Sequence, residues 1–229
     1  MNVLITGSNG FIGKNLKIRL EKLKRFNIID FNREHSEKDL LIAVKKAEII
    51  VHLAGENRPE NKEAFEEINH KLTKKICKFC GEKKSKTHII FSSSTQAKID
   101  NPYGKSKLAA EEQLLELSKD SANSVNILRF PGVFGKWCKP NYNSVVATFC
   151  NNVANNLPIN INDKSSKLNL VYIDDLVDQI LELINSPSNE IFVEAQSVHQ
   201  KTLGEVADII NSFKENRTNL YVENMQDPF

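Results

Sequence analysis

The alternation of apolar and amphipathic segments predicts an α/β fold: a Rossmann-type doubly wound parallel sheet with a small C-terminal lobe. Strand-like and helix-like patterns alternate four times before about residue 118, which is the order of parallel strands joined by crossover helices. The first strand, residues 2–6, leads directly into a glycine-rich loop and a helix. The apolar run from His88 to Phe91 ends in serines, as a buried parallel strand does where it opens into a site.

The other elements continue this pattern. The predicted strands cover residues 2–6, 27–31, 48–55, 87–92, 125–130, 168–173 and 191–193. One predicted helix follows the glycine-rich loop and ends near residue 23. The other predicted helices cover about residues 39–46, 63–80, 104–118, 144–155, 174–184 and 202–211. We expect a dinucleotide-binding core over residues 1–135 and a substrate-binding lobe over 136–229, with the strand and helix near 168–185 returning to the core. Residues 219–229 close no predicted helix or strand, so we expect a cut there rather than a natural end.

Composition excludes several classes of protein. The chain has 229 residues, of which 40% are hydrophobic, and a formal charge of +2, which gives no reason to expect nucleic acid as a partner. Its apolar segments are far shorter than the ~20 residues of a membrane helix. The amino terminus opens as a strand and not as a basic leader. We therefore expect a cytoplasmic protein with no membrane partner.

The cysteines and histidines do not predict a metal site. Cys77 and Cys80 form a CxxC pair, but it lies inside a helical pattern and has no second pair, so helix packing is the expected role. The five histidines show no metal-ligand spacing. His52 and His88 stand beside apolar strand residues and are expected to be structural.

The glycine-rich loop predicts a dinucleotide site. Gly7 permits a tight turn, Gly10 lets the backbone approach a pyrophosphate, and Gly13 lets the helix pack closely on the strand. The N–H groups that begin the helix then point at the phosphates. Small residues at the end of the third strand would let the cofactor lie against the backbone. The predicted cofactor-binding residues are Gly7, Asn9, Gly10, Phe11, Ile12, Gly13, Asp30, Arg33, Leu53, Ala54, Gly55, Tyr103 and Lys107.

Two of these residues point to different cofactors. Asp30, near the end of the second strand, would accept a hydrogen bond from the adenosine ribose of NAD(H). Arg33, three residues later, can pair with the extra phosphate of NADPH. We expect NADPH, with NAD(H) as the alternative, provided that Asp30 turns toward solvent or accepts hydrogen bonds from the backbone or from Arg33 itself.

Ser94, Tyr103 and Lys107 are the predicted catalytic residues. Tyr103 and Lys107 stand four residues apart, which places phenol and ammonium on one helical face. A free phenol has a pKa of about 10, and we expect the neighbouring charge to lower it so that Tyr103 can transfer a proton near neutral pH. Ser94 can hydrogen-bond the same substrate oxygen, with Thr95 as an alternative hydroxyl. Such a Tyr–Lys pair is common on solvated helices, so the interpretation depends on the serine-ended strand before it.

Six motifs together resemble the extended short-chain dehydrogenase/reductase family, which includes nucleotide-sugar epimerases, dehydratases and reductases. They are GSNGFIG at 7–13, HLAG at 52–55, SSS at 92–94, PYGKSK at 102–107, RFPGVFG at 129–135 and VYIDDLV at 171–177. They follow the family's order over nearly the whole chain. The resemblance implies that Tyr103 is the proton donor, that Ser94 binds the reacting oxygen, and that Lys107 holds the nicotinamide ribose and lowers the pKa of Tyr103.

A narrower likeness is to the UDP-sugar reductases of UDP-N-acetyl-L-fucosamine and capsular polysaccharide synthesis. It lies in HLAGENRPE, SSSTQAKIDNPYGKSK and FGKWCKPNYNSVVATFC. Those enzymes carry a reductase domain and then a metal-binding cupin domain, and the likeness covers only the first, so reduction alone is expected. It implies NADPH-dependent reduction of a 4-keto-6-deoxy UDP-N-acetylhexosamine by a homodimer formed through the helices near 63–80 and 104–118.

Gly132 and Leu168 depart from the family pattern, because many members have Asn and Arg there to hold the substrate's nucleotide or phosphates. We expect loop side chains to make these contacts instead. The predicted substrate-binding residues are Asn57, Arg58, Ser94, Lys136, Trp137 and Lys139.

Two alternative functions stay open. A nucleotide-sugar 4-epimerase or dehydratase that retains NAD would use the same three catalytic residues. Dehydratases of the family usually have an acidic pair directly after the catalytic hydroxyl, where this chain has Thr95 and Gln96. A non-catalytic dinucleotide-binding sensor would typically have lost the Tyr or the Lys, and this chain has both.

Overall fold

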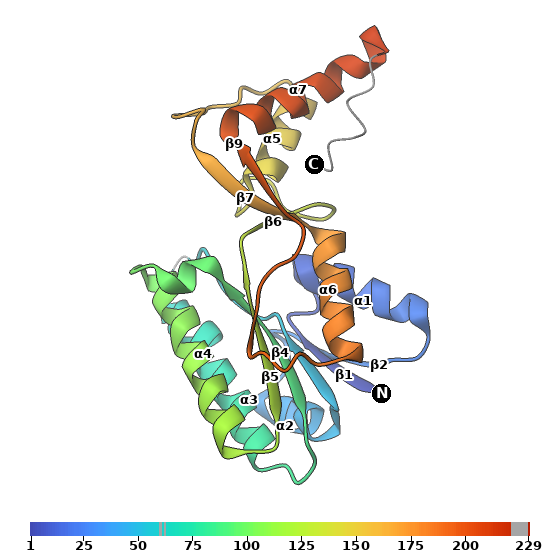
Figure 1. Ribbon diagram of the computed structural model, residues 1–229, viewed down its shortest axis with the longest axis vertical. Coiled ribbons are helices and arrows are strands. Elements are labelled where there is room, and N and C mark those ends of the chain that lie inside the picture. Colours follow the sequence, from blue (N-terminus) through green and yellow to red (C-terminus); the bar gives the residue numbers. More distant parts are fainter. Residues whose placement is uncertain (60, 62, 221–228) are drawn as a thin grey trace. The chain divides into compact units, whose positions relative to one another are not determined.

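The computed structural model describes all residues except 60, 62 and 221–228. The chain divides into two compact units (Figure 1). The first comprises residues 1–130 and 173–196, and the second comprises residues 131–172 and 197–229. Each unit has its own sheet and is described by itself.

The first unit is built on a six-stranded parallel sheet. Its strands are β1 (Asn2–Thr6), β2 (Asn27–Phe31), β3 (Ile49–His52), β4 (His88–Ser94), β5 (Ser124–Phe130) and β8 (Phe192–Val193). They lie in the order β2-β1-β3-β4-β5-β8, and every neighbouring pair is parallel. The chain starts in the middle of this sheet and winds outward both ways, which confirms the predicted doubly wound α/β fold.

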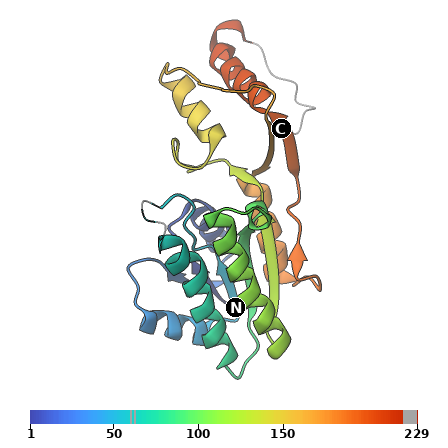
Figure 2. The same ribbon diagram turned by 90° about the vertical axis from the view of Figure 1, so that its left-hand side faces the viewer.

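Helices cover both faces of this sheet (Figures 1 and 2). They are α1 (Phe11–Leu23), α2 (Glu37–Lys46), α3 (Leu72–Gly81), α4 (Pro102–Asp120) and α6 (Ile173–Asn185), with a π-helix η1 (Phe65–Lys71) and a 3₁₀ helix η2 (Thr95–Lys98). Helices α2, α3 and α4 lie side by side on one face, and α1 and α6 pack together on the other. The carboxyl ends of the strands, where folds of this kind bind their ligands, thus lie between the two helical layers.

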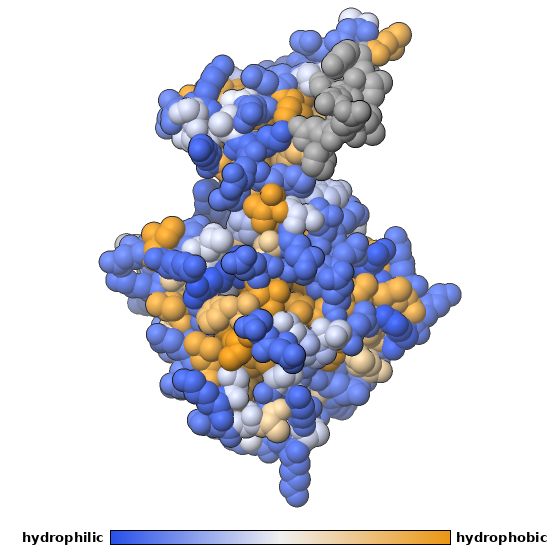
Figure 3. All heavy atoms as spheres, viewed as in Figure 1, coloured by the Kyte–Doolittle hydropathy of each residue, from blue (hydrophilic) through white to orange (hydrophobic). Residues whose placement is uncertain are grey.

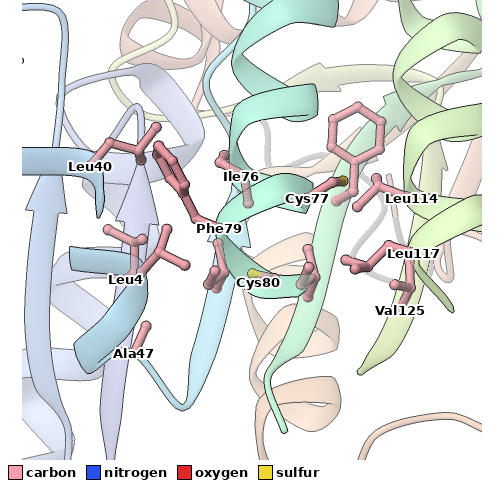
Figure 4. Packing of buried hydrophobic residues seen from close by; sticks show 14 of the residues in the cluster. Leu4, Leu40, Ala47, Ile76, Cys77, Phe79, Cys80, Leu114, Leu117 and Val125 are labelled. Carbon is pink, nitrogen blue, oxygen red and sulfur yellow. The ribbon is translucent and has the colours of Figure 1, made fainter. Parts of the chain in front are cut away.

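The core under α2, α3 and α4 is formed by apolar side chains from these helices and from the strands (Figure 4). Ile76 and Cys80 are fully buried, and Phe79 is nearly so. Burial raises the pKa of the Cys77 and Cys80 thiols to about 12. The CxxC pair is thus two inert packing residues.

Local sequence did not predict the π-helix η1. One α-helix was expected over residues 63–80, but Phe65–Lys71 is wound as a π-helix before α3 begins at Leu72. The wider turn has no simple residue signature, because it depends on which backbone groups the surrounding fold can satisfy. It is nevertheless important for the site, since it carries the buried Asn69.

The second unit has a small sheet with helices packed on it. Its elements are β6 (Gly132–Phe134), α5 (Val145–Ala154), β7 (Lys167–Tyr172), β9 (Val198–Thr202) and α7 (Leu203–Asn219). Phe149, Val153, Leu170, Val206 and Ile210 form its core.

One predicted strand lies elsewhere than expected. The strand near residues 168–173 was expected to return to the large sheet, but β7 pairs with β6 in parallel and with β9 antiparallel. Only α6, which follows it, belongs to the first unit. A cut was predicted within residues 219–229, and residues 221–228 of this tail lie outside the described part of the chain.

The surface in Figure 3 is mostly hydrophilic, with apolar side chains gathered over the middle of the first unit. Among the residues that the structure describes, no helix combines the length and apolar character needed to cross a bilayer. Within the same part of the chain, no three His, Cys, Asp or Glu side chains are grouped so as to hold a metal ion.

Candidate active site

The start of α4 packs directly on the turn that follows β4. Asn101 caps the helix by accepting a hydrogen bond from Gly104 N at 2.8 Å, and Pro102 occupies the first turn. A Cβ at Gly104 would lie 2.3 Å from the carbonyl oxygen of Gln96 and 2.4 Å from that of Ile99. Only glycine allows this approach, which brings the first turn of α4 next to the end of β4.

This packing brings the side chain of Tyr103 close to that of Ser94, which favours the ionised form of the phenol. Ser94 is buried at the last position of β4, and its Oγ accepts a hydrogen bond from Gln96 N. Burial raises the pKa of Tyr103, while the side chain of Ser94 opposes the shift. The expected lowering of this pKa is therefore wrong for this structure, because desolvation outweighs the stabilisation of the phenolate. At neutral pH the phenol keeps its proton.

Lys107 lies one turn after Tyr103 and is buried. Its Nζ donates a hydrogen bond to Ser92 O at 2.9 Å and lies 4.9 Å from the centre of the Phe91 ring. Burial lowers the pKa of Lys107 to about 8, with Glu111 acting in the opposite direction. The ammonium is thus mostly charged at pH 7.

Glu111, one further turn along α4, was not among the predicted site residues. It is 1% exposed, and its carboxylate accepts hydrogen bonds from Ser93 Oγ and from Nε and Nη2 of Arg129. These bonds tie α4 to the strand that ends in Ser94 and to β5. The spacing of Tyr103, Lys107 and Glu111 by four residues was the signal available in the sequence.

Asn69 on η1 joins the loop after β3 to α4. Its Nδ2 donates to Glu56 O and to Ser106 Oγ, both at 2.9 Å, and its Oδ1 accepts from Glu56 N at 2.7 Å. Asn69 is 1% exposed. It therefore fixes the backbone of Glu56 relative to the helix that carries Tyr103. Nothing in the local sequence distinguishes this Asn.

His52 is a buried, neutral residue at the end of β3. Burial, reinforced by the charge of Lys107, lowers its pKa to about 3. Thr73 Oγ1 donates to Asn69 O at 2.7 Å, so His52 Nε2 must donate to Thr73 Oγ1 at 2.9 Å. Nδ1 then accepts from Thr6 Oγ1 at 2.6 Å. His52 thereby links β1, β3 and α3 and carries no charge.

The glycine-rich loop is shaped by two close contacts. Gly7 has φ +71°, and a Cβ there would lie 2.9 Å from the Cα of Ala54. A Cβ at Gly13 would lie 2.3 Å from Gly7 O. Gly10 is the N-cap residue of α1 and has no side chain that could accept a hydrogen bond from the first N–H groups of the helix. The first turn of α1 also contains no acidic residue. The N–H groups that begin α1 can therefore hold a pyrophosphate in the way such loops do.

Asp30 and Arg33 have different partners. Lys17 Nζ lies 2.5 Å from Asp30 Oδ2. Burial alone would raise the pKa of Asp30, but hydrogen bonds from Lys17 and Ser8 outweigh it and hold the pKa below its ordinary value. Arg33 Nη2 lies 2.5 Å from Oε2 of Glu56, a pairing that no local sequence pattern predicts.

Comparison with known proteins assigns the family. A model described as the NAD dependent epimerase/dehydratase family matches residues 3–193 of this chain. The chain belongs to this family. The resemblance inferred from the six motifs is thereby confirmed.

Individual relatives agree with the family match. UDP-2-acetamido-2,6-beta-L-arabino-hexul-4-ose reductase of Pseudomonas aeruginosa is 41% identical over 96% of this chain and 59% of its own length. UDP-glucose 4-epimerase of Vibrio cholerae is 27% identical over 84% of this chain and 70% of its own length. The crystal structure of the capsular polysaccharide assembling protein CapF from Staphylococcus aureus has 38% identity and a TM-score of 0.87, over 99% of this chain and 61% of CapF. The chain thus spans about three fifths of the reductase and of CapF.

The residues predicted to bind substrate lie in both units of this epimerase/dehydratase family member. Asn57 and Arg58 follow β3 in the first unit, where Asn57 N donates to Oε1 of Glu56 at 3.2 Å. Asn57 Oδ1 is buried without a hydrogen-bond partner in the described part of the chain. The other predicted side chains, Lys136, Trp137 and Lys139, belong to the second unit and are exposed.

Proposed function

We propose that this chain is an NADPH-dependent reductase of a 4-keto-6-deoxy UDP-N-acetylhexosamine, acting in UDP-N-acetyl-L-fucosamine and capsular polysaccharide synthesis. The observation that carries the proposal is that the side chain of Ser94 lies beside the partly buried phenol of Tyr103, with the buried ammonium of Lys107 one turn along α4. A protonated phenol beside a second hydroxyl is what reduction of a carbonyl requires. The name of the 41% identical relative specifies reduction of a UDP-linked acetamido 4-ketohexose.

The roles of the catalytic side chains follow from their environment. The bound dinucleotide would supply the hydride. Tyr103 donates its proton to the carbonyl oxygen as that oxygen gains charge, and Ser94 donates a hydrogen bond to it. Because burial raises the pKa of Tyr103, the phenol holds a proton ready at neutral pH. Lys107 holds the nicotinamide ribose, and its charge stabilises the phenolate left after proton transfer.

The dinucleotide would be held by the carboxyl ends of β1, β2 and β3. Gly7, Asn9, Gly10, Phe11, Ile12 and Gly13 offer the loop and the start of α1, and Leu53, Ala54 and Gly55 offer a flat surface beside it. A Cβ at Gly55 would lie 3.0 Å from Lys107 Nζ. Its absence leaves room for the ribose that Lys107 is proposed to hold.

NADPH is the proposed cofactor because the two charged side chains near the adenosine site, although each is ion-paired, differ in exposure. Asp30 is engaged by Lys17, so its negative charge is already compensated. Arg33 is paired with Glu56, but its side chain is 78% exposed and can leave that pair to turn toward a 2′-phosphate. The guanidinium is suited to such a group because it can donate two parallel hydrogen bonds.

We propose that Asn57, whose buried side-chain oxygen has no hydrogen-bond partner among the described residues, and Arg58 bind the sugar or its phosphates. In the second unit, the proposed substrate-binding side chains are Lys136, Trp137 and Lys139. An indole and ammonium groups are suited to a uracil ring and a pyrophosphate, respectively.

The proposal also covers assembly and location. We propose a homodimer formed by the helices near residues 63–80 and 104–118, which are η1 with α3 and α4. The four cysteines of the chain are free thiols. This supports the proposed cytoplasmic location, because reducing compartments keep thiols reduced. Light scattering at micromolar concentration that detects only monomers would contradict the dimer.

A nucleotide-sugar 4-epimerase is the second candidate, favoured by the 27% identical relative of that name. The test uses NADPH that carries deuterium at the transferred position, mixed with a UDP-linked 4-ketohexosamine. A reductase places one deuterium at C4 and releases one NADP⁺ for each product. An epimerase that retains NAD⁺ holds no hydride for the ketone, so it would leave the 4-ketohexosamine and the deuterated NADPH unconsumed, and that result would contradict the proposed function.

A further inference from the structure

The ion pair of Arg33 and Glu56 joins the two segments that flank the glycine-rich loop. Strand β1 lies between β2 and β3 in the sheet. Gly7 N donates to Phe31 O at 2.8 Å, and Asn9 N donates to Oδ1 of Asn32 at 3.0 Å. Arg33 therefore directly follows residues 31–32, which are hydrogen-bonded to the glycine-rich loop on its β2 side. Glu56 follows the segment that Gly7 touches at Ala54 on the other side.

The two partners differ in freedom. The carboxylate of Glu56 is 10% exposed, and its Oε1 accepts a hydrogen bond from Asn57 N. Its backbone is held on both sides by Asn69, through the N–H and the carbonyl. The Arg33 side chain is 78% exposed. Glu56 is thus the fixed partner and Arg33 the movable one.

This arrangement bears on the nucleotide that the chain prefers. A 2′-phosphate would compete with a carboxylate that already holds the guanidinium in a charge-assisted hydrogen bond. NADH has no phosphate at that position and does not depend on breaking the pair. The carboxylate therefore opposes binding of the phosphate because it occupies the guanidinium of Arg33.

We propose that Glu56 is a specificity-determining residue, which limits the preference for NADPH over NADH by holding Arg33 in an ion pair that a 2′-phosphate must break. The inference rests on the proposed dinucleotide function and assigns a role to Glu56 that the catalytic side chains do not need. It makes the preference a balance between a fixed carboxylate and the phosphate for one mobile guanidinium.

Glu56→Gln tests the inference with little change of shape, because the amide oxygen can still accept from Asn57 N. We expect the ratio of NADPH to NADH affinity, measured by calorimetric titration at fixed salt, to rise about threefold to fivefold, the size of an exposed ion pair. The rise should come from tighter NADPH binding. Glu34→Gln is the matched control, since Glu34 is exposed and adjoins Arg33 in sequence. It reports the effect of removing a nearby charge that does not hold the guanidinium.

The double variant with Arg33→Ala separates the mechanisms. If Glu56 acts through Arg33, Glu56→Gln should leave the ratio nearly unchanged in the Arg33→Ala background. A ratio that is unchanged by Glu56→Gln in the parent, or raised equally by Glu34→Gln, would overturn the inference. An effect of the same size in both backgrounds would also overturn it, because the carboxylate would then repel the phosphate directly. Failure of the parent chain to bind either dinucleotide would overturn the proposed function as well, which distinguishes the two failures.

Discussion

Lys107 Nζ donates a hydrogen bond to Ser92 O at 2.9 Å, so the ammonium is held by the same strand that ends in Ser94. The strand therefore positions both the hydroxyl and the charge of the candidate site. Lys107 is buried at the cost of a lowered pKa, which gives the site a measurable pH signature.

Activity is expected to fall as pH rises through about 8, because Lys107, whose pKa burial lowers to about 8, then loses its proton. The reduction rate at saturating substrate and cofactor should follow this single ionisation. Lys107→Met should lower the rate at all pH values and remove the inflection. An inflection near pH 8 that persists in Lys107→Met would assign it to another group.

The ionisation of Lys107 is also expected to affect stability, which should rise with pH where the activity falls. The pKa of Lys107 is about 8 in the folded chain and near 10.5 unfolded. Between these values the unfolded chain binds more protons, so the Lys107 contribution to the free energy of unfolding rises with pH, by about 3 kcal/mol at most. Urea denaturation at pH 7 and pH 10 should show this rise relative to Lys107→Met. A parallel pH dependence in the two proteins would contradict the buried position of the ammonium.

Glu111→Gln should destabilise the fold by about 3 kcal/mol, because it leaves the guanidinium of Arg129 without its buried charge partner. It should also lower the pH at which the rate inflects, since the negative charge of Glu111 favours the charged form of Lys107. Glu112→Gln, at the exposed neighbouring position, is the control and should change neither quantity. Equal effects of the two substitutions would remove any special role from Glu111.

Gly104→Ala should reduce the rate and the stability together. The added Cβ would meet two backbone carbonyl oxygens at 2.3 and 2.4 Å, so α4 must move away from the turn after Ser94. Overpacking of this kind costs about 1–3 kcal/mol. Gly81→Ala is the matched control, because its Cβ would meet only a Leu117 methyl group at 3.8 Å. Retention of full activity by Gly104→Ala would show that the approach of α4 to β4 is not needed.

Arg33→Ala should reduce the preference for NADPH by roughly tenfold to a hundredfold, the range of about 1.5–3 kcal/mol for a charge-assisted contact. NADH affinity should change little. Titration of both nucleotides into the parent and the variant measures the effect. Equal affinities in the parent chain would show that Arg33 does not govern the pocket.

Local sequence was sufficient for the features that depend on neighbouring residues. The turn at Gly7, the strand and helix on either side of it, and the helical spacing of Tyr103 and Lys107 all follow from short-range rules. The resulting prediction of a doubly wound sheet is confirmed by the strand order.

The features that local sequence did not predict depend on tertiary contacts. Arg33 and Glu56 are 23 residues apart and meet only because β1 lies between β2 and β3. The raised pKa of Tyr103 reflects burial, which the i, i+4 spacing of the Lys does not indicate. The π-helix that places Asn69, and the pairing of β7 with β6 and β9, likewise have no local signature.

Tyr103 is the proposed proton donor in a reduction that uses NADPH. The most direct test is the turnover of Tyr103→Phe with a UDP-linked 4-ketohexosamine, measured together with its affinity for NADPH. Loss of the donor should lower turnover by about a hundredfold or more, while NADPH affinity stays close to that of the parent because the ring and Lys107 remain. A variant that keeps half of the parent turnover would contradict the account.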